Sequence, residues 1–173
     1  MTSPRSLFAA SLLTATLASA GWTQEGGGTV TFDAKGPAGF KIHGTCEKVV
    51  VADDLKNLTI TVKLADIDTD NGLRNKHMLE DTHAKDFPLV ILSVPVASLK
   101  ESGGPIELTG TFELNGQKKD TKFTYTPKCA GSACEIEGSA NLNLGDFGIK
   151  IRSYLGVTVK PDIVVGAKFK VKK

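Results

Sequence analysis

The stretch Leu58–Val94, LTITVKLADIDTDNGLRNKHMLEDTHAKDFPLVILSV, contains two strand patterns separated by a helical one. Its first residues alternate between apolar and polar side chains, which places Leu58, Ile60 and Val62 on one face. Alternation with a period of two is typical of a strand that has one buried face and one solvated face. The stretch therefore predicts a sheet with a single apolar side.

A short helix is predicted between these two strands. Leu73, His77 and Glu80 recur at helical spacing, and the acidic segment Asp66–Asp70 before them can cap the helix. A Phe-Pro pair then leads into a second strand over Leu89–Val94, because proline ends a helix but is tolerated where a strand begins. The sequence therefore predicts one helix of about three turns inserted between two neighbouring strands.

The same alternation recurs along the chain and predicts about eight half-buried strands in all. The clearest covers Ile106–Leu114, and the Asn115-Gly116 pair that follows it favours a tight hairpin turn. Val49–Ala52 is compatible with a further short strand. Because a sheet with one apolar face must cover that face, the pattern predicts an all-β fold, either a closed antiparallel barrel or a two-sheet sandwich. About eight strands suffice for a barrel that encloses a small ligand.

The N-terminus has the pattern of a secretory signal peptide over residues 1–20. Arg5 supplies the positive start, Leu7–Leu17 the apolar segment and Ala18-Ser19-Ala20 the small-residue cleavage site. The apolar segment is too short to span a bilayer, so we expect a periplasmic or secreted protein without a stable membrane anchor. The Gly-rich residues 21–28 are predicted to form a flexible lead-in, and residues 29–173 a single β-barrel domain.

Charge and motif content exclude several function classes. The formal net charge is +2, and the chain is near neutral once Arg5 is removed. No basic block interleaved with aromatic residues points to nucleic acid. The sequence also lacks a Gly-x-Ser-x-Gly elbow, a phosphate-cradling glycine loop and a carboxylate pair in an acid-base setting, so it predicts neither an enzyme nor a cofactor.

Histidine and acidic residues do not form a recognisable metal motif. His43 and Cys46 face opposite sides of a regular strand, and His77 and His83 are separated by the predicted end of the helix. The alternating aspartates of Asp66–Asp70 lack the glycine and the terminal glutamate of a calcium loop. We therefore predict no metal site.

Two of the three cysteines are placed for a disulfide bond. Cys129 and Cys134 flank Ala-Gly-Ser-Ala between two strand patterns, and a hairpin brings such positions within bonding distance. Export to an oxidising compartment favours the bridge, whereas the spacing does not match a redox Cys-x-x-Cys motif. Cys46 is then left over, either as a small buried hydrophobic residue or as a thiol for intermolecular pairing.

Three motifs follow one another in order along the chain: ADIDTDNGLRNKHMLEDTHAKDFPLVILS, the hairpin segment LTGTFELNG at Leu108–Gly116, and GDFGI at Gly145–Ile149 followed by Tyr-Leu-Gly. Their order and spacing resemble the YceI-like family of polyisoprenoid-binding periplasmic proteins, over roughly Thr29 to Val171. One departure is Asn75, which stands where that family usually has aspartate.

This resemblance implies an eight-stranded, lipocalin-like barrel with a helix near one end. It also implies a long apolar ligand, such as a polyisoprenoid or an isoprenoid quinone, held among inward side chains. The candidate contacts are Phe32, Phe40, Ile42, Ile60, Phe112, Tyr125, Ile163 and Phe169. The alternative is that the same side chains pack against one another as a dry core, in a filled barrel that serves as a structural or interaction module.

Arg74 and His77 complete the candidate ligand-binding residues, because they lie three apart on one face of the predicted helix. They either tie the helix to the barrel or meet the polar end of a ligand at the barrel mouth. An enzymatic role would require a buried polar cluster around this pair. The sequence leaves the oligomeric state open, with a homodimer among the options.

The predicted disulfide can be tested by counting thiols in the denatured protein. We expect one reactive thiol before reduction, from Cys46, and three after reduction. Three reactive thiols before reduction would contradict the bridge.

Overall fold

The computed structural model of the chain describes residues 21–36, 40–151, 153–154 and 157–173. The predicted signal peptide lies outside these residues. The strands are β1 (Thr23–Lys35), β2 (Lys41–Cys46), β3 (Val49–Asp53), β4 (Asn57–Lys63), β5 (Leu89–Pro95), β6 (Ile106–Leu114), β7 (Gln117–Ala130), β8 (Ala133–Asn143), β9 (Ser153–Tyr154), β10 (Val157–Thr158) and β11 (Asp162–Lys172). The helix α1 covers Gly72–Asp81, and short 3₁₀ turns cover Leu64–Asp66, Val96–Ser98 and Leu144–Phe147.

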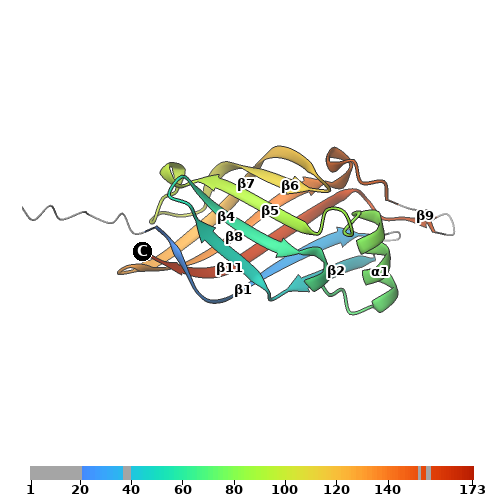
Figure 1. Cartoon of the computed structure of the whole chain (residues 1–173), viewed down its shortest axis with the longest axis horizontal. Coiled ribbons are helices and arrows are strands. Elements are labelled where there is room, and N and C mark those ends of the chain that lie inside the picture. The colour runs from blue at the N-terminus through green and yellow to red at the C-terminus, as the bar shows by residue number, and fades with distance from the viewer. Residues whose placement is uncertain (1–20, 37–39, 152, 155–156) are drawn as a thin grey trace, which may run out of the picture.

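Nine strands form one antiparallel sheet in the order β2-β1-β11-β8-β7-β6-β5-β4-β3, and β9 and β10 pair separately. The sheet curls into a nearly closed barrel, elongated and with diagonally crossing strands (Figure 1). The two edges of the sheet approach each other at two isolated bridges, one between Gly28 and Lys48 and one between Thr45 and Asp68. The helix α1 lies at one end of the barrel, and the C-terminus lies at the other (Figure 1). The predicted all-β barrel with one helix is confirmed.

The barrel differs from the prediction in its first strand and in its strand number. The additional strand is β3, in the short segment that the alternation left open. The strand β1 begins at Thr23, so most of the predicted lead-in belongs to the barrel wall. The reason is tertiary pairing, because Gln24 lies opposite Val171 of β11 and its side chain bonds to β3. Glycine content alone indicated flexibility and carried no information about these partners.

The predicted helix is present, but its cap is different. The N-cap of α1 is Asn71, whose Oδ1 accepts a hydrogen bond from the backbone N–H of Arg74 at 2.9 Å. The aspartates ahead of it shape the preceding turn instead, where Asp68 accepts from the backbone N–H of Asp70 at 3.0 Å. Both contacts satisfy backbone donors that would otherwise lack a partner.

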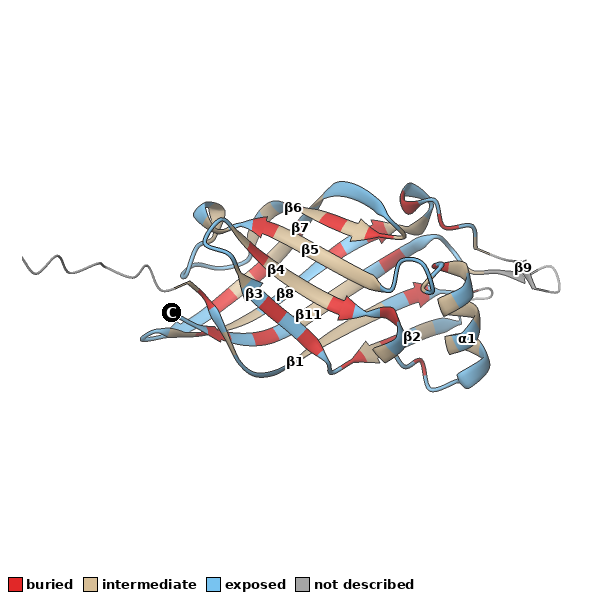
Figure 2. Cartoon of the chain, viewed as in Figure 1, coloured by how far each residue is buried: buried red, intermediate tan, exposed pale blue. Residues whose placement is uncertain are grey.

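Inward side chains form two apolar clusters within the barrel, shown by the bands of buried residues in Figure 2. The larger cluster includes Phe147, which is 1% exposed at the end of the Leu144–Phe147 turn. The carbonyl oxygen of Phe147 accepts a hydrogen bond from Nδ2 of Asn115 at 2.9 Å. The predicted hairpin residue Asn115 therefore also fixes a turn that covers the barrel interior.

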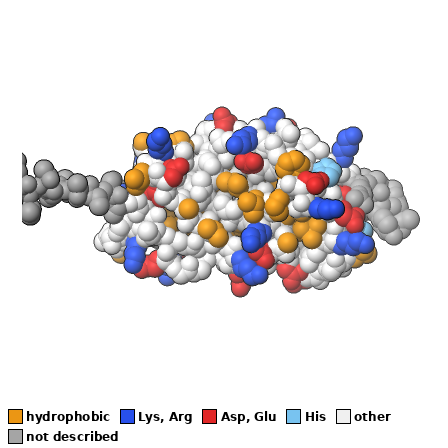
Figure 3. Space-filling view, in the orientation of Figure 1, with side chains coloured by type: hydrophobic (Ala, Val, Ile, Leu, Met, Phe, Trp, Pro, Cys, Tyr) orange, Lys and Arg blue, Asp and Glu red, His pale blue; other side chains and the backbone are white. Residues whose placement is uncertain are grey.

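Outward side chains of β6, β7, β8 and β11 form cross-strand Lys–Glu pairs. Lys122 lies 2.9 Å from Glu107, and Lys168 lies 3.2 Å from Glu135. Exposed pairs of this kind contribute little to stability, so the barrel depends on its interior. On the face seen in Figure 3, hydrophobic side chains gather over β4 and β5, and charged side chains lie mainly around them.

The disulfide bond joins Cys129 and Cys134, which lie directly opposite each other where β7 turns into β8. Cys46 is a buried free thiol in the second apolar cluster. Among the described residues, no helix is both long enough and apolar enough to cross a membrane.

We expect Phe147→Ala to lower the free energy of unfolding by about 3–5 kcal/mol, because it leaves a cavity among buried side chains. Phe40→Ala is the matched control, since Phe40 is 57% exposed and its ring lies 6.0 Å from the Arg74 guanidinium. That control should cost less than about 1 kcal/mol. Urea denaturation measures both changes, and equal losses in the two variants would contradict the core position of Phe147.

Candidate functional site

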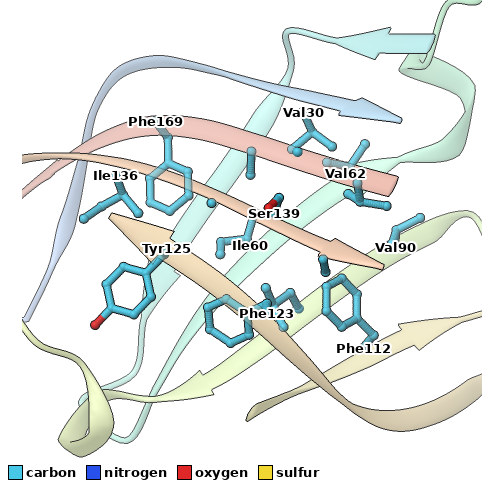
Figure 4. Close-up of a pocket in the computed structure, with 16 residues that line it drawn as sticks. Val30, Ile60, Val62, Val90, Phe112, Phe123, Tyr125, Ile136, Ser139 and Phe169 are labelled. Carbon is cyan, nitrogen blue, oxygen red and sulfur yellow. The ribbon is translucent and has the colours of Figure 1, made fainter. Parts of the chain in front are cut away.

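The barrel encloses a cavity of about 80 Å³ between its two apolar clusters (Figure 4). It is bordered by β1, β4, β5, β6, β7, β8 and β11. The lining residues are Val30, Ile60, Val62, Val90, Leu92, Phe112, Phe123, Tyr125, Ile136, Gly138, Ser139, Ala140, Val165, Gly166, Ala167 and Phe169. Nearly all of these side chains are apolar, and none is charged.

The lining includes inward side chains that their neighbours do not cover completely. On β4, Leu58 and Val62 are buried, whereas Ile60 between them on the same face is only half-buried. On β11, Ile163 is buried and Val165 next along the same face is half-buried. A tightly packed interior would bury all of these positions equally. The middle of the barrel is therefore incompletely filled.

Small residues on two adjacent strands make this space. Gly138 and Ala140 of β8 lie opposite Ala167 and Val165 of β11, where larger inward side chains would fill the barrel. At Gly138, a Cβ atom would lie 3.0 Å from the carbonyl oxygen of Thr124, so the wall itself is tightly packed behind the glycine. The cavity is thus a consequence of side-chain size on β8 and β11.

The hydroxyl of Tyr125, one of the lining residues, already has hydrogen-bond partners. The hydroxyl of Tyr125 accepts a hydrogen bond from the backbone N–H of Lys100 at 2.7 Å and donates one to the carbonyl of Lys100 at 3.1 Å. Its ring faces the cavity (Figure 4). Apart from Tyr125 and Ser139, the lining residues carry no polar side-chain atom, so the cavity gives water few partners and favours apolar matter.

The structure places the ten predicted binding residues in three settings. Those that border the cavity are Ile60, Phe112, Tyr125 and Phe169. Those that pack in or against the larger core cluster are Phe32, Ile42 and Ile163. Those at the α1 end, away from the cavity lining, are Phe40, Arg74 and His77. Several aliphatic lining residues, such as Val30, Leu92 and Ile136, were not predicted. They follow the same strand alternation, but the predicted set consisted mainly of aromatic residues.

Arg74 fastens α1 to the turn before it. Its Nε donates a hydrogen bond to Oγ1 of Thr69 at 3.1 Å, and its Nη2 donates to the carbonyl oxygen of Thr69. Thr69 is itself 2% exposed. His77 is half-buried on the same helix. These contacts hold α1 against the preceding turn, and the predicted role of Arg74 in ligand binding stays a prediction.

Asn75 bonds in a way that an aspartate could not. Its Oδ1 accepts from the backbone N–H and the hydroxyl of Thr69, at 2.9 and 2.6 Å, as a carboxylate also would. Its Nδ2 donates to Oδ1 of Asp68 at 2.9 Å, which requires an amide. This bond, together with the backbone N–H of Asp70, holds the pKa of Asp68 below its usual range.

Titratable side chains do not gather into a metal site in the described part of the chain. No group of three or more His, Cys, Asp or Glu residues there could hold an ion. The arrangement that remains is an apolar interior, closed at one end by a helix with a polar brace.

The sequence pattern of the YceI-like domain matches residues 8–171 of the chain. The chain belongs to the YceI-like family. A UPF0312 protein of Pseudomonas aeruginosa strain LESB58 is 31% identical over 137 residues, which cover 72% of this chain and 60% of that protein. Protein YceI of Escherichia coli O157:H7 is 25% identical over 131 residues, which cover 71% of this chain and 59% of that protein. The matched region thus spans about 60% of the length of these relatives.

Solved structures share the fold at lower identity. A polyisoprenoid binding domain from Saccharophagus degradans, implicated in plant cell wall breakdown, aligns with a TM-score of 0.67 at 11% identity, over 87% of this chain and 97% of that one. BcnA of Burkholderia cenocepacia aligns with a TM-score of 0.69 at 15% identity, over 83% of this chain and 95% of that one. These likenesses show that this chain shares its fold with both proteins.

We expect Asn75→Asp to reverse the pH dependence of the stability that this turn contributes to the folded protein. In the unchanged protein the lowered pKa of Asp68 contributes stability above its unfolded pKa, and this contribution is lost as the pH falls. With two facing carboxylates the folded pKa of the pair rises, so stability is lost as the pH rises through it. The variant should melt lower at neutral pH and recover part of the loss on mild acidification.

Thermal melts across this pH range make the measurement, with Asn141→Asp as the control, because Asn141 is exposed on the outside of β8. Equal melting temperatures for Asn75→Asp and the unchanged protein at neutral pH would contradict the assigned hydrogen bond.

Proposed function

We propose that this protein is an exported binding protein, periplasmic or secreted, that holds a long apolar chain of isoprenoid type inside its barrel. A polyisoprenoid or an isoprenoid quinone is the proposed ligand class. The observation that carries the proposal is the unfilled apolar interior, which lies on seven strands and contains no free charged group.

The structural neighbour from Saccharophagus degradans, which is described as polyisoprenoid binding, supports this ligand class through the shared fold and family. The chemistry of the lining agrees, since branched aliphatic and aromatic side chains contact a branched hydrocarbon without requiring polar groups. We propose binding rather than catalysis, because the hydroxyl of Tyr125 is engaged by Lys100 and the interior offers no acid, base or activated nucleophile.

The magnitudes allow useful affinity. Burial of about ten CH₂ groups at ~0.8 kcal/mol each gives ~8 kcal/mol, which corresponds to roughly micromolar affinity before the entropic costs of binding. A cavity of about 80 Å³ holds only part of a long chain, so a longer ligand is partly enclosed. The polar end of the ligand then stays outside the apolar lining. We propose that it meets Arg74 and His77, which lie on α1 at one end of the barrel.

Ala167→Leu tests the proposal, because it adds an apolar side chain that points into the cavity from β11. We expect at least about tenfold weaker binding of all-trans-retinol, a fluorescent isoprenoid alcohol, through loss of buried ligand surface. Fluorescence titration measures the dissociation constant, and competition with geranylgeraniol should displace the probe from the unchanged protein.

Val164→Leu is the matched control, since Val164 is 45% exposed on the outside of the same strand. It should bind retinol as the unchanged protein does, and circular dichroism should show both variants folded. If the unchanged protein takes up neither retinol nor geranylgeraniol, the chain is the filled-barrel interaction module instead.

A further inference from the structure

The wall of the barrel has one weak line, at the seam where β1 meets β3. Neighbouring strands of the main sheet pair by ladders, which range from three residue pairs between β5 and β6 to eleven between β8 and β11. Along the seam, three contacts join β1 to β3: the side-chain amide of Gln24, a backbone bridge from Gly28 to Lys48 just before β3, and the backbone N–H of Trp22 just before β1, which donates to Oδ2 of Asp53 at 2.7 Å. In the described part of the chain, no ladder of the main sheet joins β1 to β3.

The side chain of Gln24 makes hydrogen bonds to the backbone of β3 that a neighbouring strand would otherwise make. Its Nε2 donates to the carbonyl oxygen of Val49 at 2.9 Å, and its Oε1 accepts from the backbone N–H of Val51 at 2.8 Å. One side chain thereby pairs with two residues of β3 as a neighbouring backbone would. Separation of β1 from β3 at this point breaks side-chain bonds and leaves the main ladders intact.

The β1 strand also leaves its other neighbour close to Gln24. Between the pairs Gln24–Val171 and Gly28–Phe169, three β1 residues, Glu25, Gly26 and Gly27, face the single β11 residue Lys170. Such a bulge disrupts the ladder locally. Gly26 has a φ of 74°, and an added Cβ at Gly26 or Gly27 would meet nothing within 4 Å. The segment is therefore loosely packed on its outer side.

A surface groove of about 640 Å³ lies outside this bulge, and Phe169 borders both the groove and the interior cavity. The ring of Phe169 is directed toward the interior beside Ile136 (Figure 4). The charged residues that border the groove are Glu25, Glu47, Glu135, Lys168 and Lys170; Lys168 lies 3.2 Å from Glu135 and lowers the pKa of that carboxyl. Phe169 therefore separates the groove from the cavity, next to the bulge of β1.

We propose that the β1–β3 seam, with the glycine bulge and Phe169 behind it, is a lateral portal through which the apolar chain passes into and out of the barrel. The groove outside Phe169 is the first site that the chain contacts. This inference rests on the proposed binding function. It predicts that seam strength controls the rate of exchange and leaves the equilibrium affinity nearly unchanged, because the bound chain lies in the cavity and not in the seam.

Gln24→Glu is the decisive variant. One carboxylate oxygen can still accept from Val51, but the other faces the carbonyl oxygen of Val49, so a hydrogen bond becomes a repulsive contact. Stopped-flow fluorescence with all-trans-retinol should show association and dissociation rates that both rise roughly tenfold, with the dissociation constant preserved within about twofold. Gln117→Glu is the matched control, since Gln117 is exposed at the β6–β7 hairpin, and its rates should not change.

A second variant changes the rates in the opposite direction. Gly27→Ala restricts the bulge backbone without a steric clash, and it should slow exchange severalfold. Gly104→Ala, an equally open glycine in the loop before β6, is its control. Amide hydrogen exchange without ligand should also show the Val51 N–H exchanging faster in Gln24→Glu than in the unchanged protein.

The outcomes separate the portal from the binding function. Unchanged retinol rates in Gln24→Glu and Gly27→Ala, with normal affinity, would overturn the portal and leave the binding proposal standing. Failure of the unchanged protein to bind retinol would overturn both. A Gln24→Glu variant that loses affinity while its association rate stays constant would make the seam part of the ligand-bound structure and would also overturn the portal.

Discussion

Every long strand of the main sheet has an apolar face, and water must be excluded from that face in order for the chain to fold. Burial of apolar surface is the dominant favourable term, and a single sheet can achieve it only by covering itself. Closure into a barrel does so and also removes exposed edges. The position of α1, the Phe147 turn and the disulfide at the β7–β8 turn all follow from this closure, because each one covers or fixes an end of the barrel.

Closure also determines what the interior can do. Large inward side chains fill the two clusters near the barrel ends, whereas Gly138, Ala140 and Ala167 leave the middle incompletely filled. The same two strands that give the wall its longest ladder therefore also provide the space for a ligand. Some side chains belong both to a cluster and to the cavity lining, so the same residues stabilise the fold and shape the cavity: Val62, Phe112, Phe123, Tyr125, Ala140 and Phe169.

Local pattern predicted much of this architecture. Alternation along β4, β6 and β11 gave both the strands and their inward residues, and Asn115-Gly116 gave a turn that the structure contains with positive φ angles at both residues. The Cys129–Cys134 bridge followed from a hairpin and an oxidising compartment. In each case the decisive physical signal lay within a few neighbouring residues of the sequence.

Features that depend on distant partners were less accessible. The strand character of residues near Gln24 depends on β3 and β11, and the cavity depends on which small residues meet across β8 and β11. The alternation of side chains along the strands identified Phe32 and Ile163 as inward. It could not distinguish a core position from a position that lines a cavity, because that distinction depends on the sizes of the neighbouring side chains in three dimensions. Asn75 shows the same limit, since the reason for an amide becomes apparent only with Asp68 and Thr69 beside it.

We propose that the barrel interior holds an isoprenoid chain. The most direct measurement is native purification from the export compartment, followed by organic extraction and mass spectrometry of the co-purifying molecules. We expect a polyisoprenoid or isoprenoid quinone in an amount nearly equimolar with the protein. Protein that carries no lipid, and that also takes up no isoprenoid chain when one is supplied, would contradict it.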